Sequence, residues 1–256
     1  MIQAVVAVCG DDKYFDCAEI SIPSFLSANA GSYLTVFTDQ PERLIHIRDK
    51  SLEIRDFQQS LDRLQGKYRA YADHISTQCA EPWDNHGTNH VHKYVALLPV
   101  LGEAYTHMPF TLKIDIDSFF RGDLLIKVVG QLVTQYTMTD NFSDLYLVNR
   151  PNNGIIKPYG NELPGVGFLM WNRNGKFLDT YVHKFDGNEQ STVLNIANDM
   201  ETVLYDDFRW HCVYPFWWAE KNGREFDPDT ISPPYYMHIH ASHAREKLLE
   251  LKELYG

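Results

Sequence analysis

The sequence has no long apolar run, no paired cysteine motif and no excess of positive charge. Nowhere do its 256 residues approach the ~20 consecutive apolar residues that a transmembrane helix needs. The start, Met1-Ile2-Gln3, shows no charged segment followed by an apolar one, which is the pattern of a secretory signal. We therefore expect a protein without an integral membrane segment, located in the cytoplasm.

The few cysteines and the acidic charge narrow the function further. The chain has four cysteines and no Cys-x-x-Cys pair, which is typical of reduced thiols in a cytosolic protein. The formal net charge of −11 argues against a nucleic acid as the partner, because binding to its phosphates depends on Lys and Arg. An acidic protein can still bind a phosphorylated small molecule if a metal ion lies between them.

The first forty or so residues have the pattern of a βαβ unit. An apolar run at 2–9 predicts a buried strand, 15–28 has helical spacing, and 33–38 predicts a second strand. Ligands of such units lie beyond the carboxyl ends of the strands. The acidic and aromatic residues expected at that edge are Asp11, Asp12, Tyr14 and Asp39.

The remaining chain alternates helical and strand patterns without a repeat or a linker, so we expect one domain. Helices are predicted at 58–80, 93–105, 123–133, 175–185, 190–200 and 243–254. Strands are predicted at 52–57, 144–148, 164–172, 203–205, 210–214 and 235–240. The strand at 164–172 opens on glycines, including Gly165, which suggests a backbone that passes close to a ligand.

The central stretch is a strand predicted over 111–120, Thr-Leu-Lys-Ile-Asp-Ile-Asp-Ser-Phe-Phe. Two residues along a strand share one face, so Asp115 and Asp117 are expected to point the same way, about 6–7 Å apart. Neighbouring carboxylates raise each other's pKa, and a hard divalent cation removes that cost. Mg²⁺ and Mn²⁺ prefer such oxygen ligands, completed by diphosphate and water. An acidic strand end that faces solvent is the alternative.

The order of these motifs resembles the GT-A fold nucleotide-sugar glycosyltransferases, most closely glycosyltransferase family 8, the group of glycogenin and the bacterial lipopolysaccharide glycosyltransferases. Gly10-Asp11-Asp12-Lys13-Tyr14 is similar to the family's first nucleotide-binding loop. Lys93, at the head of a predicted helix, takes the place of a basic residue near the donor. Asp115-Ile116-Asp117 is similar to the metal and diphosphate motif.

Later motifs extend the resemblance over most of the chain. Residues 164–170 resemble the family's Asn-x-Gly-Val strand, which meets the transferred sugar, although the Asn is absent. Glu189-Gln190 resembles the Asp-Gln pair near the reacting sugar. His238 and His240 lie in a segment similar to the late strand that carries a metal-binding His, and His240 is the favoured ligand. Lys247 echoes a Lys that contacts the diphosphate.

The resemblance implies an α/β fold of the GT-A (Rossmann-like) type, with a mixed, mostly parallel sheet flanked by helices in a single domain. Residues 1–120 would be the nucleotide-binding half, and 121–256 would hold the acceptor and the late metal ligand. The implied function is metal-dependent transfer of a hexose from a nucleotide sugar, expected to be a UDP-sugar, to a glycan or lipid-linked acceptor with retention. Mn²⁺ or Mg²⁺ would be the cofactor. The aromatic run at 210–218 fits either an acceptor platform or a core strand.

Two other functions remain open. A haloacid-dehalogenase-like phosphatase also places Asp-x-Asp after an apolar strand, and Asp115 would then be the nucleophile. Against it, that motif normally opens the domain, whereas here a βαβ unit precedes it. The second alternative is a sugar-nucleotide-binding protein without catalytic activity.

Overall fold

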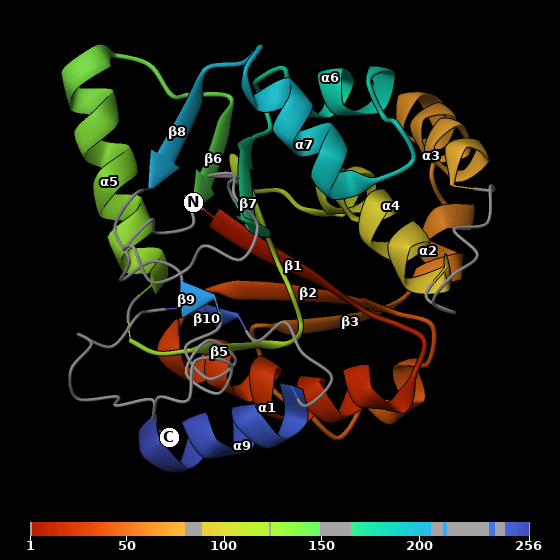
Figure 1. Ribbon diagram of the computed structural model, residues 1–256, viewed down its shortest axis with the longest axis vertical. Coiled ribbons are helices and arrows are strands. Elements are labelled where there is room, and N and C mark those ends of the chain that lie inside the picture. Colours follow the sequence, from red (N-terminus) through yellow and green to blue (C-terminus); the bar gives the residue numbers. More distant parts are fainter. Residues whose placement is uncertain are drawn as a thin grey trace, which may run out of the picture.

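The computed structural model describes residues 2–79, 89–122, 124–148, 165–205, 212–213, 236–238 and 244–255. In this part of the chain seven strands form one sheet in the order β3-β2-β1-β4-β7-β6-β8 (Figure 1). Strand β7 (Gly165–Asn172) is antiparallel to both of its neighbours, β4 (Phe110–Ile114) and β6 (Leu145–Val148), and the other pairs are parallel. The expected mixed, mostly parallel α/β sheet is confirmed.

The N-terminal βαβ unit forms as predicted. Strand β1 (Ile2–Val8) leads into α1 (Asp12–Ala28), and β2 (Tyr33–Thr38) pairs in parallel with β1. Pro23 lies inside α1 without ending it. The edge strand β3 (Leu52–Asp56) follows a short 3₁₀ turn, η1 (Pro41–Arg43). The carboxyl ends of β1 and β2 therefore point to the same edge of the sheet.

The predicted helices are present, with shifted ends. The expected helix at 58–80 is divided into α2 (Phe57–Asp62) and α3 (Gly66–Gln78). Helix α4 (Asn89–Tyr105) starts before Lys93, and residues 89–92, which precede the predicted helix, form its first turn. The remaining helices are α5 (Leu124–Thr139), α6 (Phe177–His183), α7 (Glu189–Ala197) and α9 (Ala244–Tyr255). Strand β8 (Thr202–Tyr205) follows α7.

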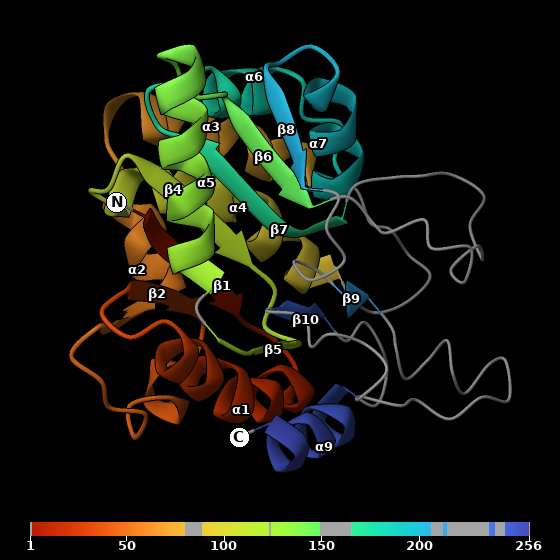
Figure 2. The ribbon, with the colours of Figure 1, turned by 90° about the vertical axis from the view of Figure 1, so that its left-hand side faces the viewer.

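A second, small sheet explains why 111–120 is not one strand. The chain leaves the main sheet after Ile114 and resumes as β5 (Ser118–Phe120), which pairs antiparallel with β10 (Tyr236–His238). Strand β10 also pairs in parallel with β9 (Cys212–Val213). The prediction of a continuous strand was wrong because residues 115–117 carry the chain from one sheet to the other. Figure 2 shows β5 beside α1 and α9.

Alternation along the central strands divides the core into two layers. Ile2, Ala4 and Val6 of β1 pack in one layer, to which α1, α5 and α9 contribute buried residues. Val5 belongs to the other layer, to which α3, α4, α6 and α7 contribute. Trp171 and Phe177 pack against each other in this second layer, with ring centroids 5.2 Å apart. In β4, Leu112 and Ile114 face the α1 layer, so Lys113 between them faces the α4 and α7 layer.

Two helix glycines differ in their surroundings, which allows a test of the packing. A Cβ on Gly102 of α4 would lie 3.2 Å from Thr111 Cγ2 and 3.3 Å from both Val5 Cγ2 and Trp171 Cη2. A Cβ on Gly130 of α5 would meet no atom within 4 Å. Helix α4 therefore packs directly on the sheet at Gly102, whereas Gly130 is exposed.

Substitution at these glycines should change stability in opposite directions. Gly130→Ala is expected to raise the free energy of unfolding by about 0.5–1 kcal/mol, because alanine is the better helix former. Gly102→Val should lower it by about 1–3 kcal/mol through overpacking against the sheet. Urea unfolding monitored by circular dichroism measures both. A Gly102→Val protein as stable as the wild type would contradict the close contact between α4 and the sheet.

Candidate active site

The Asp-x-Asp segment lies where the main sheet passes into the small one. The backbone N–H of Asp115 donates to the carbonyl oxygen of Gly167 at 3.2 Å, which holds this point against β7. Asp115 and Asp117 are both half-buried and lie outside the strands. The argument that strand periodicity aligns the two carboxylates therefore does not apply, because the backbone turns between them.

Lys113 connects this segment to helix α7. Its side chain is 2% exposed, and its Nζ donates to Asp115 Oδ1 at 2.8 Å and to Glu189 Oε2 at 3.1 Å. On the neighbouring strands Lys113 is paired with Val5 and Leu169, so both of its neighbours across the sheet are apolar. The ammonium group thus brings together two carboxylates from distant parts of the sequence.

Burial and the neighbouring charges act in opposite directions on the pKa values of Lys113 and Glu189. Burial acts to lower the pKa of Lys113, but the carboxylates of Asp115 and Glu189 outweigh it, and the pKa is raised. Burial raises the pKa of Glu189, and Lys113 opposes that change. One lysine therefore partly neutralises two acids. Glu189 Oε1 is buried and has no hydrogen-bond partner among the described residues.

The start of α7 is built to present Glu189 as its first residue. Asn188 caps the helix, and its Oδ1 accepts from Ser191 N at 3.0 Å. Gly187 has φ +93, a left-handed conformation that favours glycine. Asp186 accepts from the hydroxyl groups of Ser191 and Thr192. This hydrogen-bonded turn fixes where the Glu189 side chain leaves the backbone.

At the end of the first βαβ unit, Asp39 is the acidic residue that the fold holds most firmly. Its Oδ2 accepts from Gly10 N at 3.0 Å, while its Oδ1 is buried without a partner among the described residues. Asp12 forms an ion pair with Arg43 at 2.6 Å and its side chain is 87% exposed. Asp11 lies 3.7 Å from Lys13, and Tyr14 is half-buried in the first turns of α1.

The other predicted residues lie on separate elements. Lys93 is exposed on α4, one turn inside the helix rather than at its head. Gly165 begins β7 opposite Val148, next to an irregularity in the β6–β7 register. Gln190 is half-buried in the first turn of α7. Lys247 lies on α9, where its Nζ contacts Glu250 Oε1 at 3.2 Å. Ile116 is buried between the two aspartates.

Strand β10 approaches the Asp-x-Asp segment through its backbone. His238 is paired with Ser118, the residue that follows Asp117. His240 lies outside the described residues, as does most of the aromatic run at 210–218. Within the described part of the chain, no group of three or more His, Cys, Asp or Glu side chains is arranged to hold a metal ion. The described portion contains no helix that is both long and apolar enough to cross a membrane.

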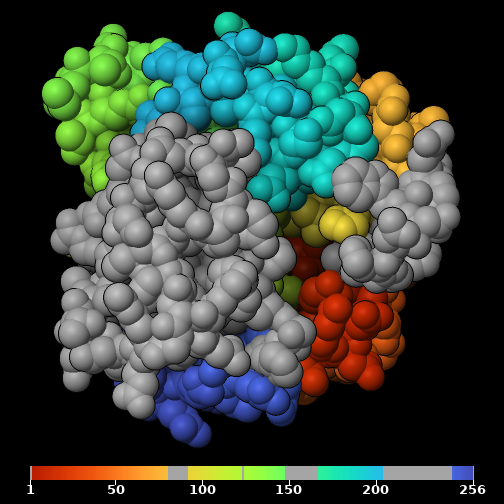
Figure 3. Space-filling view, viewed as in Figure 1, coloured from red at the N-terminus to blue at the C-terminus, as the bar shows by residue number. Residues whose placement is uncertain are grey.

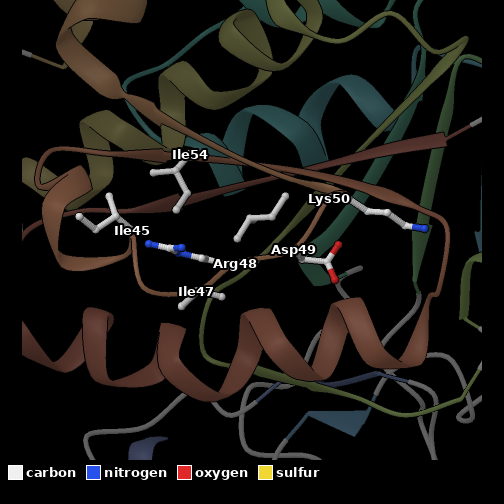
Figure 4. A pocket seen from close by; sticks show the side chains of 7 residues that line it. Ile45, Ile47, Arg48, Asp49, Lys50 and Ile54 are labelled. Carbon is white, nitrogen blue, oxygen red and sulfur yellow. The ribbon is translucent and has the colours of Figure 1, made fainter.

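The surface is hollowed at the carboxyl edge of the sheet. In Figure 3 recessed atoms with the colours of α4 and the N-terminal strand lie between α7 above and α1 below. A separate pocket of about 480 Å³ is lined by Ile45, Ile47, Arg48, Asp49, Lys50, Leu52 and Ile54 (Figure 4). That pocket borders the edge strand β3, which β2 and β1 separate from β4. It therefore does not include the Asp-x-Asp segment.

Lys113 is the residue of this cluster that the sequence analysis missed. Its sequence signal is a lysine between Leu112 and Ile114 in a central strand, where the alternation places it on a covered face of the sheet. A buried lysine requires a carboxylate partner. Asp115 was available as that partner from sequence, whereas Glu189 was not.

The fold is that of the GT-A nucleotide-sugar glycosyltransferases, as the resemblance implied. The galactosyltransferase LgtC, solved with donor and acceptor sugar analogues, aligns with a TM-score of 0.57 and 14% identity over 99% of this chain and 96% of its own. Mouse xyloside xylosyltransferase 1 aligns with a TM-score of 0.56 and 10% identity over 93% and 97%. The glycosyltransferase GlyE of Streptococcus pneumoniae has a TM-score of 0.56 and 14% identity, and the match covers 98% of this chain but 60% of GlyE. No protein-family model and no curated protein sequence matches the chain.

The turn before α7 should make stability depend on pH. Burial acts to raise the pKa of Asp186, but hydrogen bonds from Ser191 and Thr192 outweigh it and hold the pKa below its ordinary value. A carboxyl group with a depressed pKa in the folded state stabilises the protein above its unfolded pKa, and this stability is lost as the pH falls through the folded pKa. Asp186→Ala should therefore be less stable than the wild type at pH 7, and the difference should shrink towards pH 3.

Urea unfolding at pH 7, 5 and 3 measures this difference. Asp199→Ala is the control, because Asp199 is an exposed partner of Lys184 and its removal should change stability by about 0–1 kcal/mol. A loss of stability in Asp186→Ala that is equal at all three pH values would contradict a charge-dependent role.

Proposed function

We propose that the protein is a glycosyltransferase that moves a hexose from a UDP-sugar to a hydroxyl group of a glycan or lipid-linked acceptor. The observation that carries the proposal is the contact of one buried ammonium, that of Lys113, with both Asp115 and Glu189. It joins the segment suited to a diphosphate and metal to the segment suited to the sugar. The shared fold with solved glycosyltransferases supports the same function.

The metal-binding residues in this proposal are Asp115 and Asp117, with His240 as a further ligand and His238 as the alternative. Two half-buried carboxylates are a donor set that suits Mn²⁺ or Mg²⁺. The pairing of β10 with β5 brings the backbone of His238 beside the residue that follows Asp117, which is consistent with this ligand set. The cation, when bound, supplies positive charge to the diphosphate leaving group.

The nucleotide would bind at the end of the βαβ unit. Asp39 supports this placement, because its buried Oδ1 is an acceptor for a base N–H or a ribose hydroxyl. Asp11, Asp12 and Tyr14 lie on the same edge, as the first turn of α1 follows β1 directly. The further proposed contacts with the donor are Ile116, Gly165, Lys93 and Lys247. The two lysines would contact its phosphate groups.

The transfer exchanges one bond at the anomeric carbon. The bond to the diphosphate oxygen breaks, and its electron pair remains on the diphosphate. A bond to the acceptor oxygen forms, and the proton of that hydroxyl passes to the released diphosphate. Positive charge develops on the sugar in such transfers, and an anionic Glu189 beside it would stabilise that charge. Gln190 would contact the same sugar. Retention of configuration is part of the proposal through the resemblance to family 8.

A phosphatase that uses Asp115 as the nucleophile is less well supported. The Oδ1 atom of Asp115 already accepts a hydrogen bond from Lys113. The Asp-x-Asp segment also follows β4, which lies beside the antiparallel strand β7, and not the first strand of a parallel sheet. A nucleophilic Asp115 predicts hydrolysis of phosphate monoesters that Asp115→Asn abolishes, whereas a metal-ligand role predicts no such hydrolysis.

Metal-dependent nucleotide binding tests the proposed function. Calorimetry with UDP, GDP and CMP, each with and without Mn²⁺, should detect binding of UDP that requires Mn²⁺. Asp117→Ala should weaken UDP–Mn²⁺ binding by about tenfold or more, because one carboxylate ligand is lost. Asp140→Ala, at an exposed position after α5, is the control and should bind as the wild type does.

Two results would contradict the proposed function. UDP binding that is independent of Mn²⁺ would argue against the metal site. Hydrolysis of phosphate monoesters that disappears in Asp115→Asn would replace the transferase proposal by the phosphatase.

A further inference from the structure

The position of Lys113 is unusual for reasons of packing alone. The residues on the adjacent strands are Val5 and Leu169, both 0% exposed, and they belong to the cluster of buried hydrophobic side chains on this face of the sheet. An aliphatic side chain would fill this position without an ionic partner. Placing an ammonium group there requires two carboxylates to be held beside it, at 2.8 and 3.1 Å.

Stability gives little reason to keep this charge. Replacing a buried ion pair by apolar residues of similar volume is often neutral or stabilising, whereas removing one partner is costly. The ion pairs of Lys113 are therefore better explained by the position of Glu189, which they fix relative to β4. Glu189 is held through Oε2 alone, while Oε1 is buried and has no partner among the described residues. Buried acceptors in proteins nearly always have a partner, so the state of Oε1 requires an explanation, and a donor group of a bound ligand provides one.

We propose that Lys113 is a positioning residue that anchors Glu189 to the Asp-x-Asp strand, so that Glu189 Oε1 accepts a hydroxyl group of the donor sugar. The inference rests on the proposed function and adds to it the residue that orients the sugar-binding carboxylate. Asp115 is the second anchor of the ammonium group and keeps Lys113 in place when Glu189 is replaced. The ligand chemistry at Oε1 is a neutral hydroxyl donor, not a cation.

The contact between Lys113 and Glu189 joins a strand inside the sheet to the end of a helix. Lys113 lies on a central strand that is paired on both sides, so its backbone is among the more rigid parts of the fold. Helix α7 begins at Glu189, and the turn at Asp186–Asn188 joins it to helix α6 and not directly to the sheet. The contact with Lys113 therefore transfers the position of the strand to a carboxylate at a helix end. Misplacing a positioning group by about 1 Å can lower a rate by about 100-fold.

A double-mutant cycle separates this role from a structural one. The proteins are the wild type, Lys113→Met, Glu189→Gln and the double variant, each assayed with Mn²⁺ for the release of UDP from a UDP-hexose. Lys113→Met should lower kcat by about 100-fold. In the Glu189→Gln background the same change should have almost no further effect, because Lys113 acts through Glu189.

A binding measurement accompanies the kinetics. The affinity for UDP with Mn²⁺ should stay within about threefold in Lys113→Met, because loss of a cation beside Asp115 does not weaken its attraction to a divalent ion. Lys184→Met is the matched control: it removes a lysine that is paired with Asp199 on the surface and should change neither kcat nor affinity. Urea unfolding establishes that each variant is folded.

If Lys113→Met does not fold, the cycle still decides the matter. The double variant removes both buried charges, which proteins tolerate better than one uncompensated charge. Its kcat must equal that of Glu189→Gln, and a further fall of tenfold or more would overturn the inference. An active Lys113→Met with kcat within about threefold of the wild type would overturn it directly. A wild type that neither binds UDP with Mn²⁺ nor transfers sugar would instead refute the proposed function, and this inference with it.

Discussion

The site depends on one electrostatic constraint: a buried ammonium group that lies between two carboxylates. Lys113 is 2% exposed, and its Nζ contacts both Asp115 and Glu189. A lone charge at this depth would be costly, so the three side chains are stable only together. This requirement links the end of β4 to the start of α7. The turn before α7, the register of β4 against β7 and the packing of α7 on the sheet all have to agree with it.

The change from the main sheet to the small sheet gives the Asp-x-Asp segment its exposure. A strand that continued past Ile114 between β1 and β7 would cover its side chains with helices, as happens to Lys113. Because β5 pairs with β10 instead, residues 115–117 lie at the edge of both sheets. Asp115 is consequently 23% exposed at its side chain, although its neighbour two residues earlier is almost fully covered. Lys113 is thus an internal counter-charge, whereas Asp115, two residues later, is partly exposed at the surface.

Local patterns predicted the elements well, since long apolar alternation and turn residues determine strands and helices directly. The βαβ unit and the strand ends at Thr38 and Asn172 followed from such patterns. The break at residues 115–117 did not, because alternation continues through Asp115 and Asp117 and only the distant β10 draws β5 out of the sheet. Glu189 was predicted as a site residue from a resemblance. Its contact with Lys113 depends on how α7 packs on the sheet, which the spacing of residues in the sequence does not reveal. The predicted roles of the site residues remain predictions.

The overall acidity of the chain makes the internal lysine more informative. With a formal net charge of −11, the protein repels a diphosphate unless positive charge is placed near it. Lys113 is positive but almost fully covered, and its ammonium group contacts two carboxylates, so the main positive charge for a diphosphate has to come from another group. The cluster of Lys113, Asp115 and Glu189 keeps one net negative charge when all three are ionised. In the proposed transfer such a cluster would attract a cation at its exposed side, where Asp115 lies, and would stabilise a sugar that becomes positive near Glu189. The same three side chains therefore favour both charges that the proposed transfer requires, one bound and one transient.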